Sequence, residues 1–239
     1  MTRARRLVRL LVPFGVRRPL GIALYRVWRT TRRTLRELLG RLPFLAARDF
    51  AYDDRFYDKG DPMKLESYPR FARALIGLRS PRSVVDVGCG SGLMLAEFAK
   101  HGVSVRGVEG SRAAIRRSGL GERIVRANLE RGVPDLGRYD LCLCTEVGEH
   151  LSARSARRLV AGLTRLSDVI VFTASPPEDG TGGVAHMNSK PKSYWRTLFA
   201  DHAFAESPLE NELLAAIADV PEPRYLHENL IVFERSPSG

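Results

Sequence analysis

The sequence has no long uninterrupted apolar run, and nothing in it approaches the roughly 18 residues that a membrane-spanning helix needs. A clean signal peptide is missing too, because Arg residues interrupt every apolar stretch near the N-terminus. Cysteine is scarce, with Cys89, Cys142 and Cys144 the only 3 in the chain. Cys142 and Cys144 lie two apart on one expected strand, a poor geometry for a mutual disulfide. We therefore expect reduced cysteines and a cytoplasmic protein.

Acidic residues are nearly absent from one end of the chain. Residues 1–41 hold 12 Arg, no Lys and no Asp, with Glu37 as their single acid. The whole chain has 38 basic and 27 acidic residues, so the part beyond residue 41 has a net charge of zero. This distribution argues against a nucleic-acid channel through the fold, and nucleic acid is an unlikely partner. It indicates a basic arm that has a partner of its own.

We expect residues 1–45 to form this arm, as a unit separate from residues 46–239. Between residues 22 and 39, apolar residues including Tyr25 and Trp28 recur near helical spacing with Arg between them. A basic amphipathic helix can lie on an anionic membrane, so residues 1–41 predict peripheral membrane contact. Contact with a partner protein, packing on the domain and a transit peptide are the alternatives.

The rest of the chain alternates between short apolar strands and helices. After a helical lead-in over residues 46–80, strands are expected at 83–88, 103–109, 123–128, 139–144, 168–174 and 229–235. Helices are expected at about 92–101, 111–118, 153–166 and 191–201. Strands joined through helices imply crossover connections and a mainly parallel sheet, an α/β fold.

A glycine-rich stretch, VVDVGCGSG, joins the first strand to the first of these helices. Glycine at 88, 90 and 92 lets the backbone turn tightly and approach a ligand. Asp86 lies within the strand, where a carboxylate suits an amino-bearing or cationic ligand. Glu109 ends the next strand and could accept bonds from both hydroxyls of a ribose. Asn128 ends the third strand, where its amide could reach an adenine edge.

These stretches, with GVEGS, IVRANLE and YDLCLCTEVGEHL in this order, resemble the class I S-adenosylmethionine-dependent methyltransferases over residues 82–235. The resemblance implies a doubly wound, Rossmann-like sheet of seven strands, the last antiparallel. It implies S-adenosyl-L-methionine as cofactor. The cofactor-binding residues that it implies are Asp86, Gly88, Cys89, Gly90, Gly92, Glu109, Gly110, Ser111, Asn128 and Leu129. Asn128 departs from the pattern, since many members have Asp there.

The segment TEVGEHL follows the fourth strand. Glu146, Glu149 and His150 are spaced i, i+3 and i+4, so one helical turn would project them from one face. Two carboxylates and an imidazole suit a divalent metal, and His186, after the fifth strand, is a fourth candidate ligand. The ExxEH pattern resembles ubiquinone-pathway O-methyltransferases and small-RNA terminal-ribose methyltransferases, in which it is associated with a metal. Without metal, His150 and His186 are candidates for acceptor chemistry, and a structural role is the third alternative.

Together these features predict an enzyme that methylates a hydroxyl of a small molecule or glycan, of the small bacterial type. Glycines at 180, 182 and 183 predict a loop that could close over the substrate, followed by a helix with Trp195 and Phe199 in the core. An RNA methyltransferase that uses the basic arm is one alternative. A non-catalytic module that keeps the fold is the other.

Overall fold

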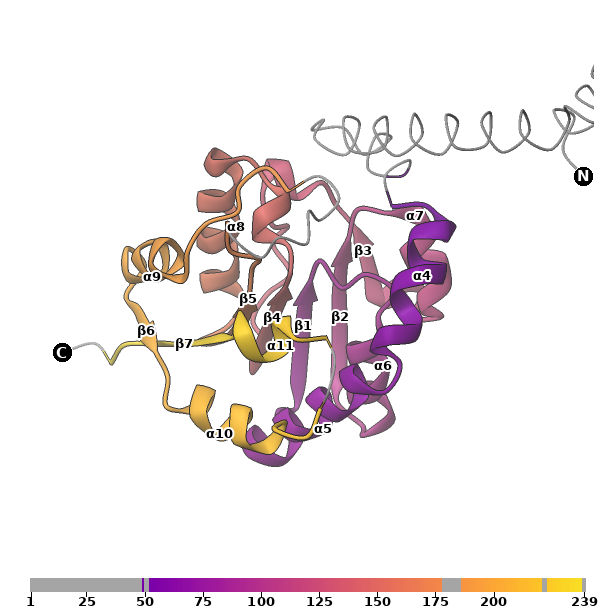
Figure 1. Ribbon diagram of the computed structural model, residues 1–239, viewed down its shortest axis with the longest axis horizontal. Coiled ribbons are helices and arrows are strands. Elements are labelled where there is room, and N and C mark those ends of the chain that lie inside the picture. Colours follow the sequence, from indigo (N-terminus) through magenta and orange to yellow (C-terminus); the bar gives the residue numbers. More distant parts are fainter. Residues whose placement is uncertain (1–48, 50–51, 178–185, 221–222, 238–239) are drawn as a thin grey trace, which may run out of the picture.

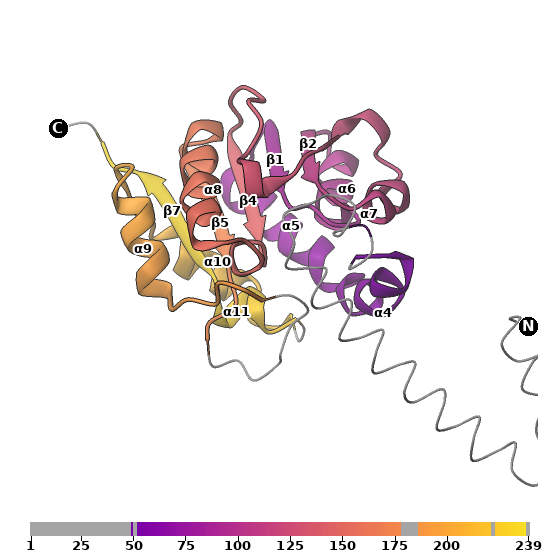
Figure 2. The same cartoon turned by 90° about the horizontal axis from the view of Figure 1, so that it is seen from above.

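The computed structural model describes residues 49, 52–177, 186–220 and 223–237. The predictions for the basic arm, residues 1–45, and for the glycines at 180, 182 and 183 fall outside these residues. The part that is described is a sheet covered by helices on both faces (Figures 1 and 2).

The sheet has seven strands in the order β3-β2-β1-β4-β5-β7-β6. The strands are β1 (Ser83–Val87), β2 (Ser104–Glu109), β3 (Ile124–Arg126), β4 (Leu141–Thr145), β5 (Val169–Thr173), β6 (Phe204–Glu206) and β7 (Ile231–Arg235). The first five are parallel, and β7 runs antiparallel to both β5 and β6. The chain reverses its direction of travel across the sheet between β3 and β4, which leaves a crevice beside β1.

Helices flank this sheet and connect its strands. They are α4 (Asp54–Lys64), α5 (Ser67–Arg79), α6 (Leu93–Lys100), α7 (Arg112–Ser118), α8 (Ala153–Leu166), α9 (Lys192–Ala200), α10 (Leu209–Ala216) and α11 (Tyr225–Glu228). Three short 3-10 turns, η1 (Gly121–Arg123), η2 (Leu129–Arg131) and η3 (Gly148–His150), lie in the connections.

Each face of the sheet carries its own apolar core. On one face, α5, α6 and α10 pack against the sheet, and Phe71, Leu75 and Phe98 are fully buried there. On the other face, α8 and α9 bury Trp195 and Phe199 against Phe172. The prediction that Trp195 and Phe199 are core residues is confirmed. All three cysteines are buried and free, as expected.

The fold class is confirmed, including the antiparallel final strand. Six strands were located from the sequence, and each overlaps a strand of the structure. The strand that the sequence did not reveal is β6, a three-residue edge strand with one buried side chain, Phe204. A strand this short contains no apolar run that would indicate it in the sequence.

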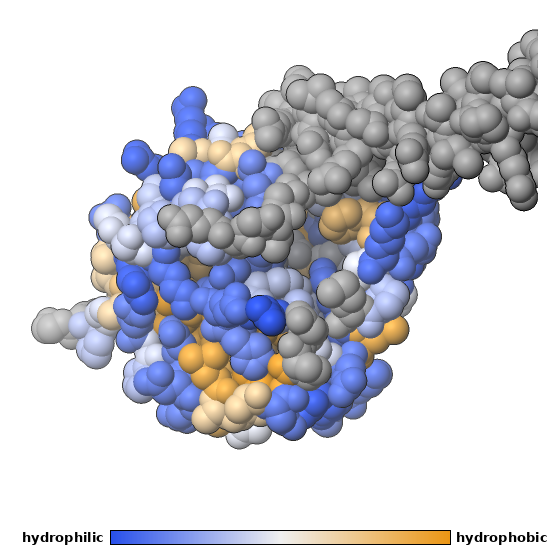
Figure 3. Space-filling model, in the orientation of Figure 1, coloured by the Kyte–Doolittle hydropathy of each residue, from blue (hydrophilic) through white to orange (hydrophobic). Residues whose placement is uncertain are grey.

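Polar and charged side chains cover most of the face seen in Figure 3. Among the residues that the structure describes, Leu65 is the only large apolar side chain classed as exposed, at 59%. No helix in this part of the chain combines the length and the apolar character that crossing a bilayer would require.

Candidate active site

A cavity of about 250 Å³ lies at the carboxyl ends of β1, β2 and β4. This is the crevice where parallel α/β sheets bind their ligands. The glycine-rich loop after β1, the end of β2 and the turn after β4 contribute to its walls, and α4 and α11 complete it. Of the cofactor residues expected from the sequence, the cavity is lined by Asp86, Gly88, Cys89, Gly90, Glu109, Gly110, Ser111, Asn128 and Leu129.

The glycine loop needs its glycines for two different reasons. Gly88 has φ of +85°, and a Cβ atom on it would lie 2.3 Å from Cγ2 of Val147, so a side chain is excluded by both strain and space. Gly92, at φ +73°, does not line the cavity but precedes α6. A Cβ atom on Gly92 would meet Leu120 at 2.9 Å, so this glycine serves the packing of the loop.

Glu109 ties the loop to the end of β2. Its carboxylate accepts hydrogen bonds from the backbone N–H groups of Gly90 at 2.9 Å and of Gly110 and Ser111 at 2.7 Å each. These bonds hold the glycine loop in place before any ligand arrives.

Asp86 is the buried acid of this wall. Its side chain is 3% exposed, and its Oδ1 atom has no hydrogen-bond partner in the described structure. The pKa of Asp86 is raised to about 7, chiefly by burial and also by the Glu109 carboxylate, while Lys64 opposes both. A buried acceptor without a donor is costly unless a ligand supplies one. The α-amino group of a methionine moiety would fit this position.

The far wall is formed by Asn128 and Leu129. The Asn128 side chain accepts a hydrogen bond from the N–H of Glu130 at 3.1 Å and so caps the turn η2.

Cys89 belongs to the glycine loop, and burial raises the pKa of its thiol well above the usual value. The thiol is therefore neutral, and packing is the role that its surroundings support.

The backbone of TEVGEHL differs from the single helical turn that its spacing suggested. Glu146 follows β4 with φ of +54°, in the left-handed region that a non-glycine residue rarely adopts. Only Gly148–His150 forms a turn of 3-10 helix. Glu146 therefore does not project from the same helical face as Glu149 and His150.

Three of the four candidate metal ligands converge. One ligand atom each of Glu149, His150 and His186 lies within 4.8 Å of the others. The Nε2 atom of His150 is 3.8 Å from Oε1 of Glu149, and the rings of His150 and His186 are 4.7 Å apart. The main-chain oxygen of Glu149 accepts bonds from the N–H groups of Met187 and Asn188, at 2.8 and 2.9 Å. These bonds bring the segment with His186 onto the turn.

Glu149 has the environment of a cation ligand. It is fully buried, and neither carboxylate oxygen accepts a hydrogen bond within the described residues. Burial raises its pKa well above the usual range, and the neighbouring Glu146 raises it further. One carboxylate and two imidazoles form a donor set that suits Zn²⁺ or another first-row transition metal better than Mg²⁺.

Glu146 is held apart from this group by other partners. Its carboxylate accepts a hydrogen bond from the Ser175 hydroxyl at 2.6 Å and from the Asn229 amide at 3.2 Å. It lines the same cavity as the three converging residues. Glu146 is therefore part of the cavity wall, with its carboxylate held in a fixed orientation, and it is not among the converging ligand atoms.

Several cavity residues were missed by sequence reasoning. They come from the N-terminal lead-in and from α11, and they are Tyr52, Phe56, Tyr57, Asp61, Lys64, Tyr68 and Tyr225. The hydroxyls of Tyr68 and Tyr225 form a hydrogen bond, and the Tyr52 hydroxyl lies 3.1 Å from Nδ1 of His150. The available signal was the aromatic run DFAYDDRFYD, which is unusual for a solvent-facing helix.

Comparisons with known proteins agree with this geometry. Residues 61–165 match a family model described as a methyltransferase domain. A ubiquinone biosynthesis O-methyltransferase of Alkalilimnicola ehrlichii is 29% identical over 143 residues, which cover 56% of this chain and 51% of that protein. Its counterpart in Acinetobacter baylyi is 31% identical over 100 residues, covering 38% and 40%. The chain thus spans about half the length, or less, of these curated relatives.

Solved structures share the fold at low sequence identity. The sugar N-methyltransferase KedS8 from a Streptoalloteichus species aligns with a TM-score of 0.57 at 19% identity, over 76% of this chain and 92% of that one. DesVI from Streptomyces venezuelae aligns with a TM-score of 0.58 at 15% identity, over 75% and 97%. Together, the family match, the glycine loop and the strand order identify a methyltransferase domain over residues 61–165, with a fold like that of the class I S-adenosylmethionine-dependent enzymes.

Proposed function

We propose that the chain binds S-adenosyl-L-methionine and transfers its methyl group to a hydroxyl of a small molecule or glycan. The observation that carries this proposal is the position of Glu149, His150 and His186, which line the same cavity as the cofactor loop. The names of the curated relatives, ubiquinone biosynthesis O-methyltransferases, support oxygen as the acceptor atom.

On the cofactor side of the cavity, the protein has to orient the cofactor and does not have to activate its methyl group. The sulfonium already carries a reactive methyl group, so the protein has to align the acceptor and exclude water. In this proposal Asp86 receives the amino group and Glu109 the ribose hydroxyls. Gly88 and Gly90 let the backbone approach the sulfonium end, and Asn128 and Leu129 border the adenine.

On the acceptor side, His150 and His186 would orient the hydroxyl and remove its proton. The Tyr52 hydroxyl at Nδ1 of His150 fixes the ring, so that Nε2 is directed toward Glu149. The donor set also fits a divalent cation, with Glu149, His150 and His186 as the ligands. When bound, such an ion would lower the pKa of the acceptor hydroxyl.

Calorimetry tests the acceptor side directly. Zn²⁺, Mn²⁺ and Mg²⁺ are titrated into the protein saturated with S-adenosylhomocysteine, and into the Glu149→Ala and His186→Ala variants. The exposed Glu122, outside the cavity, provides the matched control Glu122→Ala. We expect saturable binding of Zn²⁺ or Mn²⁺ that both cavity variants lose and the control keeps. Absence of metal binding by the wild type would leave His150 and His186 as metal-free acid–base groups.

An acceptor screen tests the reaction class. Catechols, sugars with vicinal hydroxyls and primary amines of similar size are incubated with cofactor, and methylated products are measured by mass spectrometry. Methyl transfer to hydroxyl compounds supports the proposal. Transfer confined to amines, or binding of S-adenosylhomocysteine without turnover on any acceptor, would contradict it.

The basic arm receives a separate proposal, since it lies outside the described residues. Residues 1–41 would contact an anionic membrane surface and hold a cytoplasmic enzyme near a membrane-proximal acceptor. Co-sedimentation of the full chain with vesicles, with and without anionic lipid, tests it. We expect binding that requires anionic lipid and that is lost when Arg26, Arg29, Arg32, Arg33 and Arg36 are replaced by Gln. Equal binding to neutral vesicles would oppose it.

A further inference from the structure

The cavity that would hold the cofactor is lined by acids. Its carboxylates belong to Asp61, Asp86, Glu109, Glu146 and Glu149, whereas Lys64 is the only Lys or Arg among the described lining residues. Lys64 is the last residue of α4 and is half-buried, with its ammonium group 5.3 Å from the centre of the Tyr68 ring. A single cation in such a wall should have a specific role.

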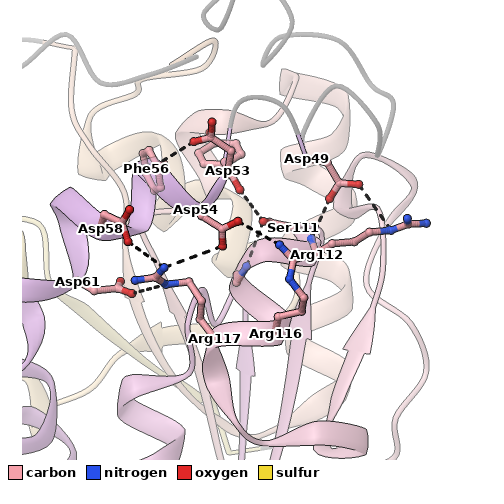
Figure 4. Close-up of polar contacts among 12 residues, drawn as sticks. Asp49, Asp53, Asp54, Phe56, Asp58, Asp61, Ser111, Arg112, Arg116 and Arg117 are labelled. Atoms are coloured by element: carbon pink, nitrogen blue, oxygen red, sulfur yellow. Dashed lines mark hydrogen bonds and ion pairs between the residues drawn. The ribbon is translucent and has the colours of Figure 1, made fainter. Parts of the chain in front are cut away.

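Most of these acids are already engaged by other groups. Asp61 lies 3.5 Å from the guanidinium of Arg117, which also contacts Asp58 (Figure 4). Glu109 accepts its backbone bonds, and Glu146 is held by a hydroxyl and an amide. Asp86 and Glu149 differ from them, because Oδ1 of Asp86 and both carboxylate oxygens of Glu149 are buried without a hydrogen-bond partner in the described structure. Glu149 lies beside His150 and His186, which leaves Asp86 as the unpartnered acid of the glycine-loop side.

Lys64 is the positive counterpart of Asp86. Within the described residues, Lys64 makes neither a hydrogen bond nor an ion pair, in contrast to the arginines of the neighbouring α7. Burial lowers the pKa of Lys64, and the cavity carboxylates oppose this, Asp61 most and Asp86 least. Lys64 in turn lowers the pKa of Asp86, yet the two side chains form no direct ion pair. On the side of the glycine loop, the cavity therefore presents an acid, Asp86, and a cation, Lys64, that form no direct ion pair with each other.

A zwitterion is the ligand that such a pair fits. The methionine moiety of the cofactor ends in an ammonium and a carboxylate on one carbon atom. We propose that Lys64 binds the carboxylate of this moiety while Asp86 receives its ammonium group. The inference rests on the proposed function, because it takes the cofactor to be S-adenosylmethionine. It assigns to α4 a part in cofactor binding that the glycine loop and β2 do not supply.

Truncated ligands test this assignment without any turnover. S-adenosylhomocysteine carries both groups, decarboxylated S-adenosylhomocysteine keeps the amine alone, and 5′-methylthioadenosine lacks both. Their dissociation constants are measured by calorimetry for the wild type, Lys64→Met and Asp86→Asn. Lys59→Met is the matched control, because Lys59 lies exposed on the same helix outside the cavity.

We expect Lys64→Met to weaken S-adenosylhomocysteine binding roughly ten- to a hundredfold, the range of a charge-assisted hydrogen bond. Its affinity for the decarboxylated ligand and for 5′-methylthioadenosine should stay within about twofold of the wild type. Asp86→Asn should weaken both amine-bearing ligands and leave 5′-methylthioadenosine unchanged. Retained binding of 5′-methylthioadenosine also shows that a variant is folded.

Two results would overturn this inference and leave the proposed function intact. One is unchanged S-adenosylhomocysteine affinity in Lys64→Met, and the other is an equal loss for all three ligands, which would mean that Lys64 shapes the cavity. A wild type that binds none of the three ligands would instead overturn the proposed function, so the two failures are distinguishable.

Discussion

The two helices that precede β1 are attached to the domain in different ways. Helix α5 buries Phe71, Ala72 and Leu75 completely and is part of the core beneath the sheet. Helix α4 has a small apolar contact, in which Tyr57 packs with Ala113 and Ala114 of α7. Its further contacts with α7 include ion pairs of Asp54 and Asp58 at the surface and of the more buried Asp61, drawn in Figure 4.

This difference matters because α4 covers the cavity. Exposed ion pairs contribute little stability each, a median of about 0–1 kcal/mol, and salt screens them. Burial of a large apolar side chain contributes more and is not screened by salt. We infer that α5 belongs to the rigid scaffold, whereas α4 can separate from α7 at low energetic cost to admit a ligand.

The largest expected effect comes from removing the α5 anchor. Phe71→Ala should lower the free energy of unfolding by about 3–5 kcal/mol, because a fully buried ring leaves a cavity behind. The half-buried Phe56 of α4 is the matched position, and Phe56→Ala should cost about 1 kcal/mol. Urea denaturation followed by circular dichroism measures both. Equal losses would contradict the distinction between the two helices.

Cofactor affinity should depend on pH through Asp86. Because its pKa is about 7 in the ligand-free protein, Asp86 is largely protonated at pH 6 and ionised at pH 8. Only the ionised form attracts an ammonium, so affinity for S-adenosylhomocysteine should rise roughly tenfold from pH 6 to pH 8. Calorimetry at several pH values measures the rise. Asp86→Asn, or 5′-methylthioadenosine as the ligand, should remove it, and a rise that persists in either case would point to another group.

Loosening of α4 should appear in hydrogen exchange. Arg117 contacts Asp54, Asp58 and Asp61, and Arg117→Ala removes these contacts together. We expect amides of α4 to exchange faster, by at most about fivefold, with α5 unchanged. Mass spectrometry of peptides from both helices measures this, with the exposed Arg123, outside this network, replaced as the control. Acceleration of both helices alike would mean that they open as one unit.

The smallest effect is expected at the junction of the two helices. Leu65 is 59% exposed, so Leu65→Ser should change the free energy of unfolding by less than about 0.5 kcal/mol. Thermal unfolding of the full chain measures it. A clear destabilisation would indicate that another part of the chain or a second copy covers this side chain.

The sheet was predictable because its strands are apolar on both faces. Every residue of β4 and β5 is buried, and such runs stand out between helices. The edge strand β6 and the helices α10 and α11 were not predicted from the sequence, because they are short and only partly buried. Their conformation depends on contacts with the sheet and with α5, which local sequence does not encode.

In the site, residue types were easier to predict than backbone geometry. The spacing of Glu146, Glu149 and His150 and the later His186 indicated a cluster, and the structure brings together the last three but not Glu146. The left-handed conformation of Glu146 has no local signal in a non-glycine residue. Lys64 was not foreseeable from its neighbours either, since it reaches the cavity only because α4 crosses over the crevice.

The contact between Gly148 and Trp195 has a practical consequence. A Cβ atom on Gly148 would lie 2.4 Å from Cη2 of Trp195, so the turn that carries Glu149 and His150 rests directly on the indole ring. The chain has 2 Trp residues, and the other is Trp28. A chain with Trp28→Phe would thus hold a single fluorophore under the candidate metal ligands. Its emission would serve as a built-in optical readout of whatever binds above it.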